Sequence, residues 1–263
     1  MIIAQISDTH IQTAQPGAAL RLEALERAVR SINALSERPV AVLHTGDVAH
    51  DATDEDYAAA AAVLGRREAP VFAIMGNRDR RHAFRRAFDA EGYLDSRSPF
   101  IQYAVEVGGL RLVALDTFDE DSGLGHFCDE RDRECAALLE QGRGRPTLVF
   151  LHHAPVPMPD LSVNPLQWRD HGRAALLLER LANAPGVVGV VAGHVHRAQS
   201  VGLVGKDGPR GPKRTLLTTI PSIAPDLRRE KLIPKSDLRP IYHLHRIDGE
   251  STTTASVQVP LDV

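Results

Sequence analysis

Seven side chains that could hold metal ions recur along the chain. They are Asp8, His10, Asp47, Asn77, His152, His194 and His196. Histidine, aspartate and an asparagine oxygen suit Mn²⁺, Fe, Co²⁺ or Zn²⁺, and the lack of a thiolate ligand argues against a structural zinc site. Seven ligands are too many for one ion but suffice for two, with Asp47 bridging. Two ions about 3.5–4 Å apart form a clamp suited to in-line displacement at phosphorus.

Apolar runs precede these polar residues and predict the strands that position them. The runs are Ile2–Ile6, Val40–Leu43, Val71–Met75, Leu110–Leu115, Thr147–Leu151 and Val187–Val191. Their unbroken Val/Ile/Leu character is typical of strands buried on both faces. Because ligands bind outside the carboxyl ends of strands in open α/β sheets, the seven side chains should converge there. Gly46, Gly76 and Gly193 stand beside three of them and let the backbone turn sharply.

Helical patterns alternate with these runs, and strand patterns fill the rest. One apolar helix face is expected over residues 22–35, and a capping box at Thr53–Asp56 opens a second helix. "DERDRECAALLEQG" and "HGRAALLLERLANAPG" predict two more, and Gly108–Gly109 predicts a two-residue hairpin turn. After Val195 only strands are expected, with Gly205–Arg214 as an exposed hairpin tip. We therefore predict an α/β fold with two sheets packed face to face and helices outside.

The composition of the chain argues against several classes of protein. The 263 residues are 43% hydrophobic and 25% charged, with a net charge of −3, which argues against nucleic acid as the main partner. Two cysteines are too few for a disulfide framework. The chain begins with "MIIAQISDTH", which is not a signal peptide, and no segment approaches a membrane span. We expect a cytoplasmic protein acting on a small molecule, with a homodimer left open.

The ordered motifs "DTH", "GD", "GNRD", "HHAP" and "GHVH" resemble those of the calcineurin-like metallophosphoesterase superfamily. The resemblance covers the chain to about Arg197, and "QISDTH", "HHAPVP" and "GHVHR" are most similar to class III cyclic-nucleotide phosphodiesterases and related glycerophosphodiesterases. It implies a four-layer α-β-β-α sandwich in a single domain over residues 1–263. The metal-ligand core would be residues 1–197, and antiparallel strands in residues 198–263 would complete the second sheet.

The resemblance also implies a ligand set and a reaction. One ion would be held by Asp8, His10, Asp47 and His196, and the other by Asp47, Asn77, His152 and His194. Mn²⁺ or Fe²⁺/Fe³⁺ are the ions expected first, with Zn²⁺ and Co²⁺ as further choices. The implied reaction is in-line attack of a metal-bridging hydroxide on a small soluble phosphodiester, either a 3′,5′-cyclic nucleotide or a glycerophosphodiester.

Arg78 stands where most members of the superfamily carry histidine, a residue that contacts the substrate phosphate and is often assigned as proton donor. Arginine can grip phosphate oxygens with two parallel hydrogen bonds but cannot release a proton. We expect Asn77 and Arg78 to bind substrate, and water or another residue to protonate the leaving group. His153 is the nearest candidate in sequence, with a structural role equally open. Asp79 is expected to orient metal ligands rather than bind metal.

The "GNRD" motif also occurs in the UDP-2,3-diacylglucosamine pyrophosphohydrolases, which supply an alternative function. Those enzymes shelter acyl chains under an apolar helical lid, whereas the insert between Asp116 and Thr147 is charged. A non-catalytic scaffold of the same fold is a further alternative, although such scaffolds typically lose ligand histidines. Trp168 lies in a proline-rich loop and either stacks on a nucleobase or packs the loop down. His243 and His245 are expected on one partly exposed sheet face.

Overall fold

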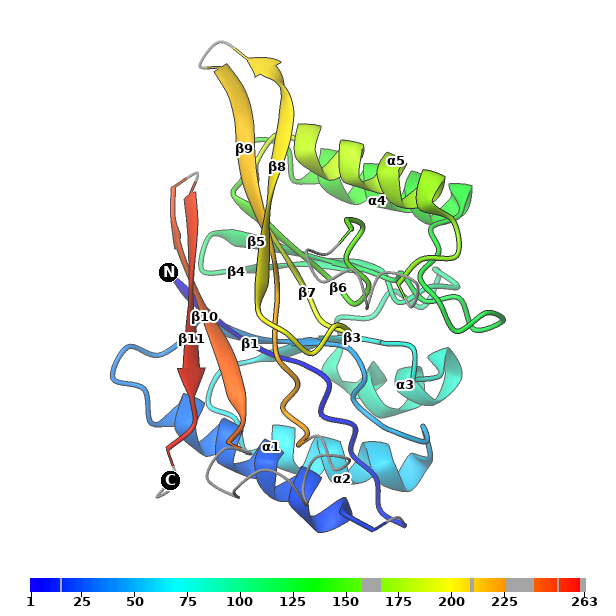
Figure 1. The fold of residues 1–263 in the computed structure, drawn as a ribbon, viewed down its shortest axis with the longest axis vertical. Helices are drawn as coiled ribbons and strands as arrows, with labels where there is room; N and C mark the ends of the chain where they lie inside the picture. Colours follow the sequence, from blue (N-terminus) through cyan, green and yellow to red (C-terminus); the bar gives the residue numbers. More distant parts are fainter. Residues whose placement is uncertain (15, 158–166, 209–210, 226–238, 250, 261–263) are drawn as a thin grey trace.

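A computed structural model describes residues 1–14, 16–157, 167–208, 211–225, 239–249 and 251–260 (Figure 1). Its helices are α1 (Ala18–Asn33), α2 (Asp54–Leu64), α3 (Arg81–Phe88), the 3₁₀ helix η1 (Asp89–Glu91), α4 (Asp129–Gln141) and α5 (His171–Asn183). Its strands are β1 (Ile2–Ile6), β2 (Ala41–Thr45), β3 (Val71–Ile74), β4 (Tyr103–Val107), β5 (Leu110–Leu115), β6 (Thr147–Leu151), β7 (Val187–Ala192), β8 (Gln199–Gly208), β9 (Gly211–Thr219), β10 (Ile241–Asp248) and β11 (Ser251–Gln258).

The strands form two mixed sheets, with the orders β11-β10-β1-β2-β3 and β4-β5-β6-β7-β9-β8. Figure 1 shows α1, α2 and α3 on the outer side of the first sheet and α4 and α5 on the outer side of the second. The predicted α-β-β-α sandwich is therefore confirmed. The strands β1, β2 and β3 run parallel, as do β5, β6, β7 and β9, so the carboxyl ends of these strands point toward common sheet edges.

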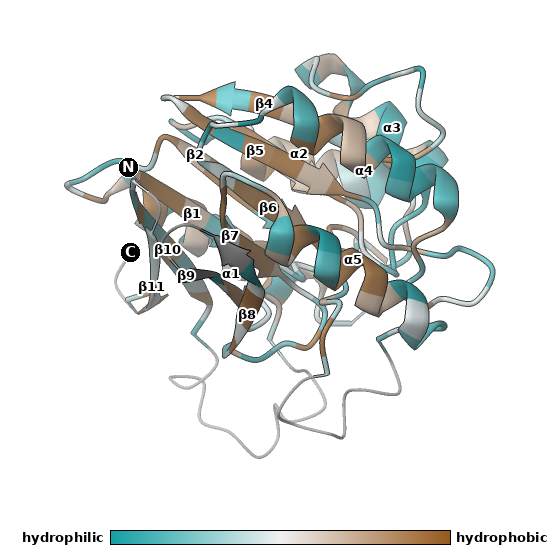
Figure 2. Ribbon diagram, turned by 90° about the horizontal axis from the view of Figure 1, so that it is seen from above, coloured by the Kyte–Doolittle hydropathy of each residue, from teal (hydrophilic) through white to brown (hydrophobic). Residues whose placement is uncertain are grey.

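Burial explains the apolar runs of the sequence. Every residue of β1, β2, β5, β6 and β7 is buried, and Figure 2 shows these strands as largely hydrophobic ribbons between the helix layers. One apolar cluster, from Ile3 to Val259, joins α1, α2 and α3 to both sheets. A second cluster, which includes Leu177 and Val190, packs α4 and α5 on the other face of the second sheet. The first cluster links the two sheets, and the single-domain organisation stays a prediction.

Local signals in the sequence give the expected turns and caps. Thr53 caps α2, with its hydroxyl oxygen accepting a hydrogen bond from the backbone N–H of Asp56 at 3.1 Å. Gly108 and Gly109 join β4 to β5 with φ angles of 59° and 87°, in the left-handed region that glycine tolerates. In the described part of the chain, no helix is long and apolar enough to cross a membrane.

The C-terminal strands correct the predicted topology. They are divided between the sheets: β8 and β9 extend the second sheet, whereas β10 pairs with β1 of the first. Moreover, β9 runs parallel to β7 rather than antiparallel. An alternating pattern identifies a strand but not its partner, and β10 covers the edge of β1 that would otherwise be open. The predicted loop Gly205–Arg214 is mostly strand, because β8 reaches Gly208 and β9 begins at Gly211; residues 209–210 lie outside the described part.

Candidate metal centre

The structure brings the seven predicted ligands together in two groups that meet at Asp47. On one side, His10 Nε2 lies 3.3 Å from His196 Nε2, His196 Nε2 lies 3.1 Å from Asp8 Oδ1, and His10 Nε2 lies 3.7 Å from Asp47 Oδ2. The second group lies around the other oxygen of the same carboxylate. Asp47 therefore presents one oxygen to each group, as a carboxylate that bridges two ions does.

The second group joins an amide oxygen to two imidazoles. Asn77 Oδ1 lies 3.1 Å from His152 Nε2 and 3.0 Å from His194 Nδ1. The same His152 nitrogen lies 3.6 Å from Asp47 Oδ1. Two donors bound to one ion at about 2.0–2.2 Å are separated by about 3–3.6 Å, so these spacings fit a common ion.

Charge at the site also fits divalent cations. Asp8 is fully buried and Asp47 is 3% exposed. Burial, together with the neighbouring charge of Asp8, raises the pKa of Asp47 to about 8. Burial opposes ionisation of Asp8 as well, but the nearby His196 holds its pKa well below the usual range. Two buried carboxylates this close require compensating positive charge, which metal ions would supply.

Backbone conformation at the site is unusual. Five of the seven ligands have positive φ angles, from 43° to 69°: Asp8, His10, Asp47, His194 and His196. Residues other than glycine rarely adopt this region, and such strain concentrates at functional sites. The backbone turns at the strand ends therefore direct these side chains toward one another. The sequence predicted that neighbouring glycines would provide the turns, but mostly the predicted ligands themselves adopt the left-handed conformation.

The neighbouring glycines are needed mainly for space. A Cβ atom on Gly76 would lie 2.2 Å from Asp47 Oδ1, and one on Gly46 would lie 2.4 Å from His152 Nδ1. A Cβ on Gly193 would lie 2.9 Å from Asp8 Oδ2. Of the three, only Gly46 also has a positive φ, of 99°. These glycines let backbone approach the ligands closely enough to form the centre.

Buried partners orient the ligands. The Asp79 carboxylate accepts hydrogen bonds from the backbone N–H groups of Val48, Ala49 and Gly76 and from the Tyr57 hydroxyl. Asp79 thus ties the loop that carries Asp47 to the loop that carries Asn77, and its role in orienting metal ligands stays a prediction. Burial, with Asp47 nearby, raises its pKa to about 6. His152 Nδ1 lies 2.7 Å from the carbonyl oxygen of Thr45, the contact that fixes a ligating histidine.

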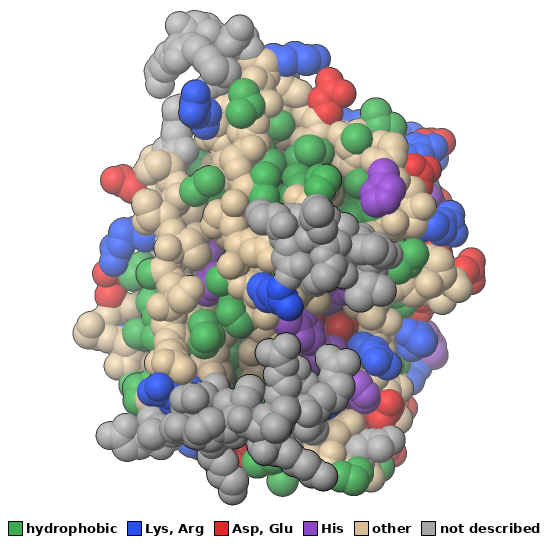
Figure 3. Space-filling model, in the orientation of Figure 1, with side chains coloured by type: hydrophobic (Ala, Val, Ile, Leu, Met, Phe, Trp, Pro, Cys, Tyr) green, Lys and Arg blue, Asp and Glu red, His purple; other side chains and the backbone are tan. Residues whose placement is uncertain are grey.

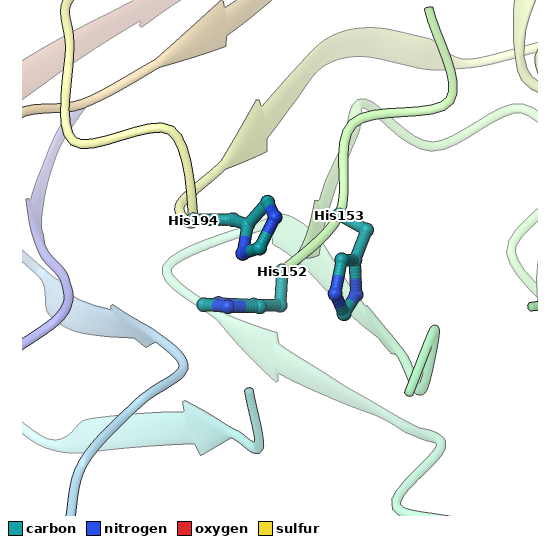
Figure 4. A group of neighbouring side chains, drawn as sticks. All are labelled: His152, His153 and His194. Carbon is teal, nitrogen blue, oxygen red and sulfur yellow. The ribbon is translucent and has the colours of Figure 1, made fainter. Parts of the chain in front are cut away.

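His153 lies beside the candidate metal centre and does not face its opening to solvent. Figure 4 shows its ring leaving the backbone on the other side from His152, which extends beneath His194. His153 is fully buried, with Nδ1 3.1 Å from the Thr117 hydroxyl and Nε2 without a partner among the described residues. One nitrogen from each of the three histidines lies within 4.8 Å of the others. His153 therefore has contacts with the ligands but does not line the cavity described below.

The described contacts of Trp168 and Asp116 are structural. Trp168 is 5% exposed, and its indole N–H donates to the carbonyl oxygen of Ala154 at 2.7 Å, so the described contacts are those of a packing residue. Most of its loop, residues 158–166, lies outside the described part. Asp116 is fully buried and paired with the Arg81 guanidinium at 2.7 Å, so it positions α3 and not the metal ligands.

A cavity of about 400 Å³ opens over the centre. Its described lining comprises His10, Arg21, Asp47, His50, Asn77, Arg78, His194, His196, Ser222, Ala224 and Pro225. Figure 3 shows histidine side chains surfacing together near the middle of one face, with Lys or Arg side chains beside them. The exposed Arg78 belongs to this lining, and its backbone N–H donates to Asp47 Oδ1 at 2.7 Å. Sequence reasoning missed Arg21 and Ser222, because nothing in a helix pattern or a strand end marks them.

Comparison with known proteins places these features in a family. The model for calcineurin-like phosphoesterases matches residues 1–198. The chain is 30% identical over 200 residues to the glycerophosphodiester phosphodiesterase GpdQ of Enterobacter lignolyticus, covering 74% of this chain and 71% of that protein. It is 28% identical over 243 residues to the 3′,5′-cyclic adenosine monophosphate phosphodiesterase CpdA of Pseudomonas aeruginosa, covering 89% and 83%. The chain belongs to the calcineurin-like phosphoesterase family.

Proposed function

We propose that the chain is a metal-dependent phosphodiesterase with a two-ion centre, acting on a small phosphodiester of the cyclic-nucleotide or glycerophosphodiester class. The observation that carries the proposal is the division of ligands about Asp47, whose two oxygens face His10 and His152. Mn²⁺ or iron ions suit the donors best, with Zn²⁺ and Co²⁺ next. When bound, such ions neutralise charge on phosphoryl oxygens and activate water.

Arg78 would hold the reacting phosphoryl group. Its guanidinium has no hydrogen-bond partner among the described residues, lies on the cavity lining, and follows Asn77 in the chain. The backbone contact to Asp47 fixes the residue beside the ion centre without occupying the side chain. Because a guanidinium keeps its protons, Arg78 would bind and orient the ester while solvent water protonates the leaving group.

The names of the relatives support the substrate classes, and the charged cavity disfavours the lipid-linked alternative. Apart from Ala224 and Pro225, the described lining of the cavity consists of polar or charged residues, which favour a charged substrate group over an acyl chain. The "GNRD" motif nevertheless favours testing a UDP-linked lipid as the second candidate.

The test is hydrolysis of a panel by protein loaded with Mn²⁺, Fe²⁺, Zn²⁺ or Co²⁺ in turn. The panel contains cyclic AMP, glycerophosphocholine, bis(4-nitrophenyl) phosphate, 4-nitrophenyl phosphate and a UDP-linked diacylglucosamine. We expect both diester classes to outpace the monoester and the lipid. Preference for the UDP-linked lipid would support the pyrophosphohydrolase, and inactivity with every metal would support a scaffold.

A further inference from the structure

We propose that Arg21 recognises a second anionic group on the substrate, so that this enzyme prefers phosphodiesters carrying a carboxylate or phosphate in addition to the reacting ester. The inference rests on the proposed diesterase function and narrows its substrate class. It assigns to a residue of α1 a role in specificity that is separate from the grip of Arg78 on the reacting group.

Arg21 is held at the cavity by its attachment to a ligand loop. Its Nη1 donates to the carbonyl oxygen of His10 at 2.8 Å, while its buried Nε has no partner among the described residues. Partial burial lowers the pKa of Arg21, the charge of Arg78 lowers it further, and Asp51 opposes both effects. In the described part of the chain, no carboxylate forms an ion pair with Arg21. A half-buried guanidinium of this kind is suited to pairing with an anion that arrives with the substrate.

The charge of the cavity exceeds what a simple diester neutralises. Its described lining holds two guanidiniums, Arg21 and Arg78, and one carboxylate, Asp47, which belongs to the ion centre. Two divalent ions would bring four positive charges, of which Asp8 and Asp47 offset two. A phosphodiester carries a single negative charge, which is smaller than the remaining positive charge of the ions and Arg78 together. A second negative group would meet Arg21, whose charge Asp51 offsets only through space and without an ion pair.

The two arginines flank different ligands. The backbone N–H of Arg78 donates to Asp47, and Arg78 follows Asn77, which puts it beside the proposed position of the reacting phosphoryl group. Arg21 is attached to His10, whose ring also packs edge-on against His50 at 5.6 Å between centroids. The second anion would therefore lie on the His10 side of the cavity, beyond the reacting phosphate. A volume of about 400 Å³ leaves room for both groups.

A matched pair of chromogenic diesters tests the assignment. Ethyl 4-nitrophenyl phosphate and 2-carboxyethyl 4-nitrophenyl phosphate share a leaving group and differ by one carboxylate, and the methyl ester of the latter is its neutral control. We expect wild-type kcat/KM to favour the carboxylate about tenfold, mainly through KM, as one charge-assisted contact allows. Arg21→Gln should bring the ratio between the two substrates to about one, and Arg21→Lys should restore part of it.

Arg27→Gln is the matched control, since Arg27 lies on the same helix but donates to the Pro260 carbonyl oxygen away from the cavity. It should keep the tenfold ratio. A wild-type ratio near one, or a preference that survives Arg21→Gln, would overturn the proposal. Equal losses on both substrates in Arg21→Gln would show that both arginines grip the same phosphate, and would also overturn it.

Calorimetric binding of ethyl phosphate and 2-carboxyethyl phosphate separates this proposal from the diesterase function. We expect the carboxylate to tighten binding about tenfold to wild type and not to Arg21→Gln, with or without loaded metal. If neither nitrophenyl ester is hydrolysed but this binding difference is seen, the proposed function fails while Arg21 keeps its role. Equal binding of the two phosphates to wild-type protein would refute the role of Arg21.

Discussion

The chain contains two His-x-His motifs that the fold uses in opposite ways. His194 and His196 follow β7, where the backbone leaves the sheet with φ angles of 69° and 54°, and their nitrogens face Asn77 and Asp8. His243 and His245 lie inside β10, where both side chains are almost fully buried. The first pair opens onto a cavity, whereas the second is enclosed between strands.

Hydrogen bonding shows why the second pair is structural. His245 Nε2 lies 2.9 Å from Gln5 Oε1, and its Nδ1 lies 2.9 Å from the Thr254 hydroxyl. Because an amide oxygen can only accept, Nε2 carries a proton, and burial keeps the ring neutral by lowering the pKa of His245. Gln5 in turn donates to Thr45 and to the Ala192 carbonyl oxygen, so the network joins the two sheets. Position relative to a strand end, rather than residue spacing, separates the candidate metal-binding pair from the packing pair.

The largest expected difference between the pairs is in catalysis. His194→Gln should lower kcat/KM for bis(4-nitrophenyl) phosphate by about 10³-fold or more, because a ligand to one ion is lost. His243→Gln, in the buried pair, should keep activity close to wild type. Steady-state kinetics with elemental analysis of both variants checks this. Comparable activity losses in the two variants would remove the distinction.

The role of Arg78 is expected to give the next largest effect. Arg78→Ala should lower kcat/KM for the aryl diester about 100-fold, because a charge-assisted contact to the phosphoryl group is lost. Arg78→His should instead raise turnover of alkyl diesters relative to nitrophenyl diesters, because histidine can protonate a poor leaving group. Kinetics on an alkyl and a nitrophenyl ester measure the ratio. An unchanged ratio in Arg78→His would contradict the assigned role.

Burial of the second histidine pair should lower the free energy of unfolding as the pH falls. Burial lowers the pKa of His245 to about 3, below the value of about 6.5 of an unfolded chain. The unfolded state therefore takes up this proton first, and the stabilisation present above pH 6.5 is lost as the pH falls toward 3. Between pH 6.5 and 5 the loss is about 2 kcal/mol for this one group. Urea unfolding of metal-free protein at the two pH values measures it.

The variant His245→Gln isolates that contribution. The pH dependence of its unfolding free energy should be shallower than that of wild type by about 2 kcal/mol over the same interval. His82→Gln, at an exposed histidine on α3, should behave as wild type. Parallel pH profiles for wild type and His245→Gln would show that His245 is not held neutral by the fold.

The smallest effect should come from a residue that touches no metal ligand. Tyr57→Phe removes the hydroxyl that donates to Asp79 Oδ1 at 2.8 Å and should weaken metal affinity about tenfold. Metal-binding calorimetry measures this change. The neighbouring Phe84→Leu, which alters the same apolar cluster without touching Asp79, is the matched control. Equal metal affinities in wild type and Tyr57→Phe would mean that the hydrogen bond from Tyr57 to Asp79 does not help to orient the metal ligands.

Much of the site was predictable because it depends on strand ends. Asp8, Asp47, Asn77 and His152 follow apolar runs, and parallel strands bring such positions to one edge whatever the loops do. The layers of the fold were predictable from the alternation of strand and helix patterns along the sequence. Arg21 was not predictable, because its approach to His10 depends on how α1 packs. The burial of His243 and His245 was missed because β10 was given no partner, and the pairing with β1 is what encloses them.

Metal titration of the metal-free protein, with hydrolysis of bis(4-nitrophenyl) phosphate followed at each addition, tests the central claim most directly. The division of ligands about Asp47 predicts that activity rises to a plateau at about two Mn²⁺ or Fe²⁺ ions per chain, and that His194→Gln stays near baseline throughout. A plateau at one ion, or activity that does not depend on added metal, would contradict the two-ion centre.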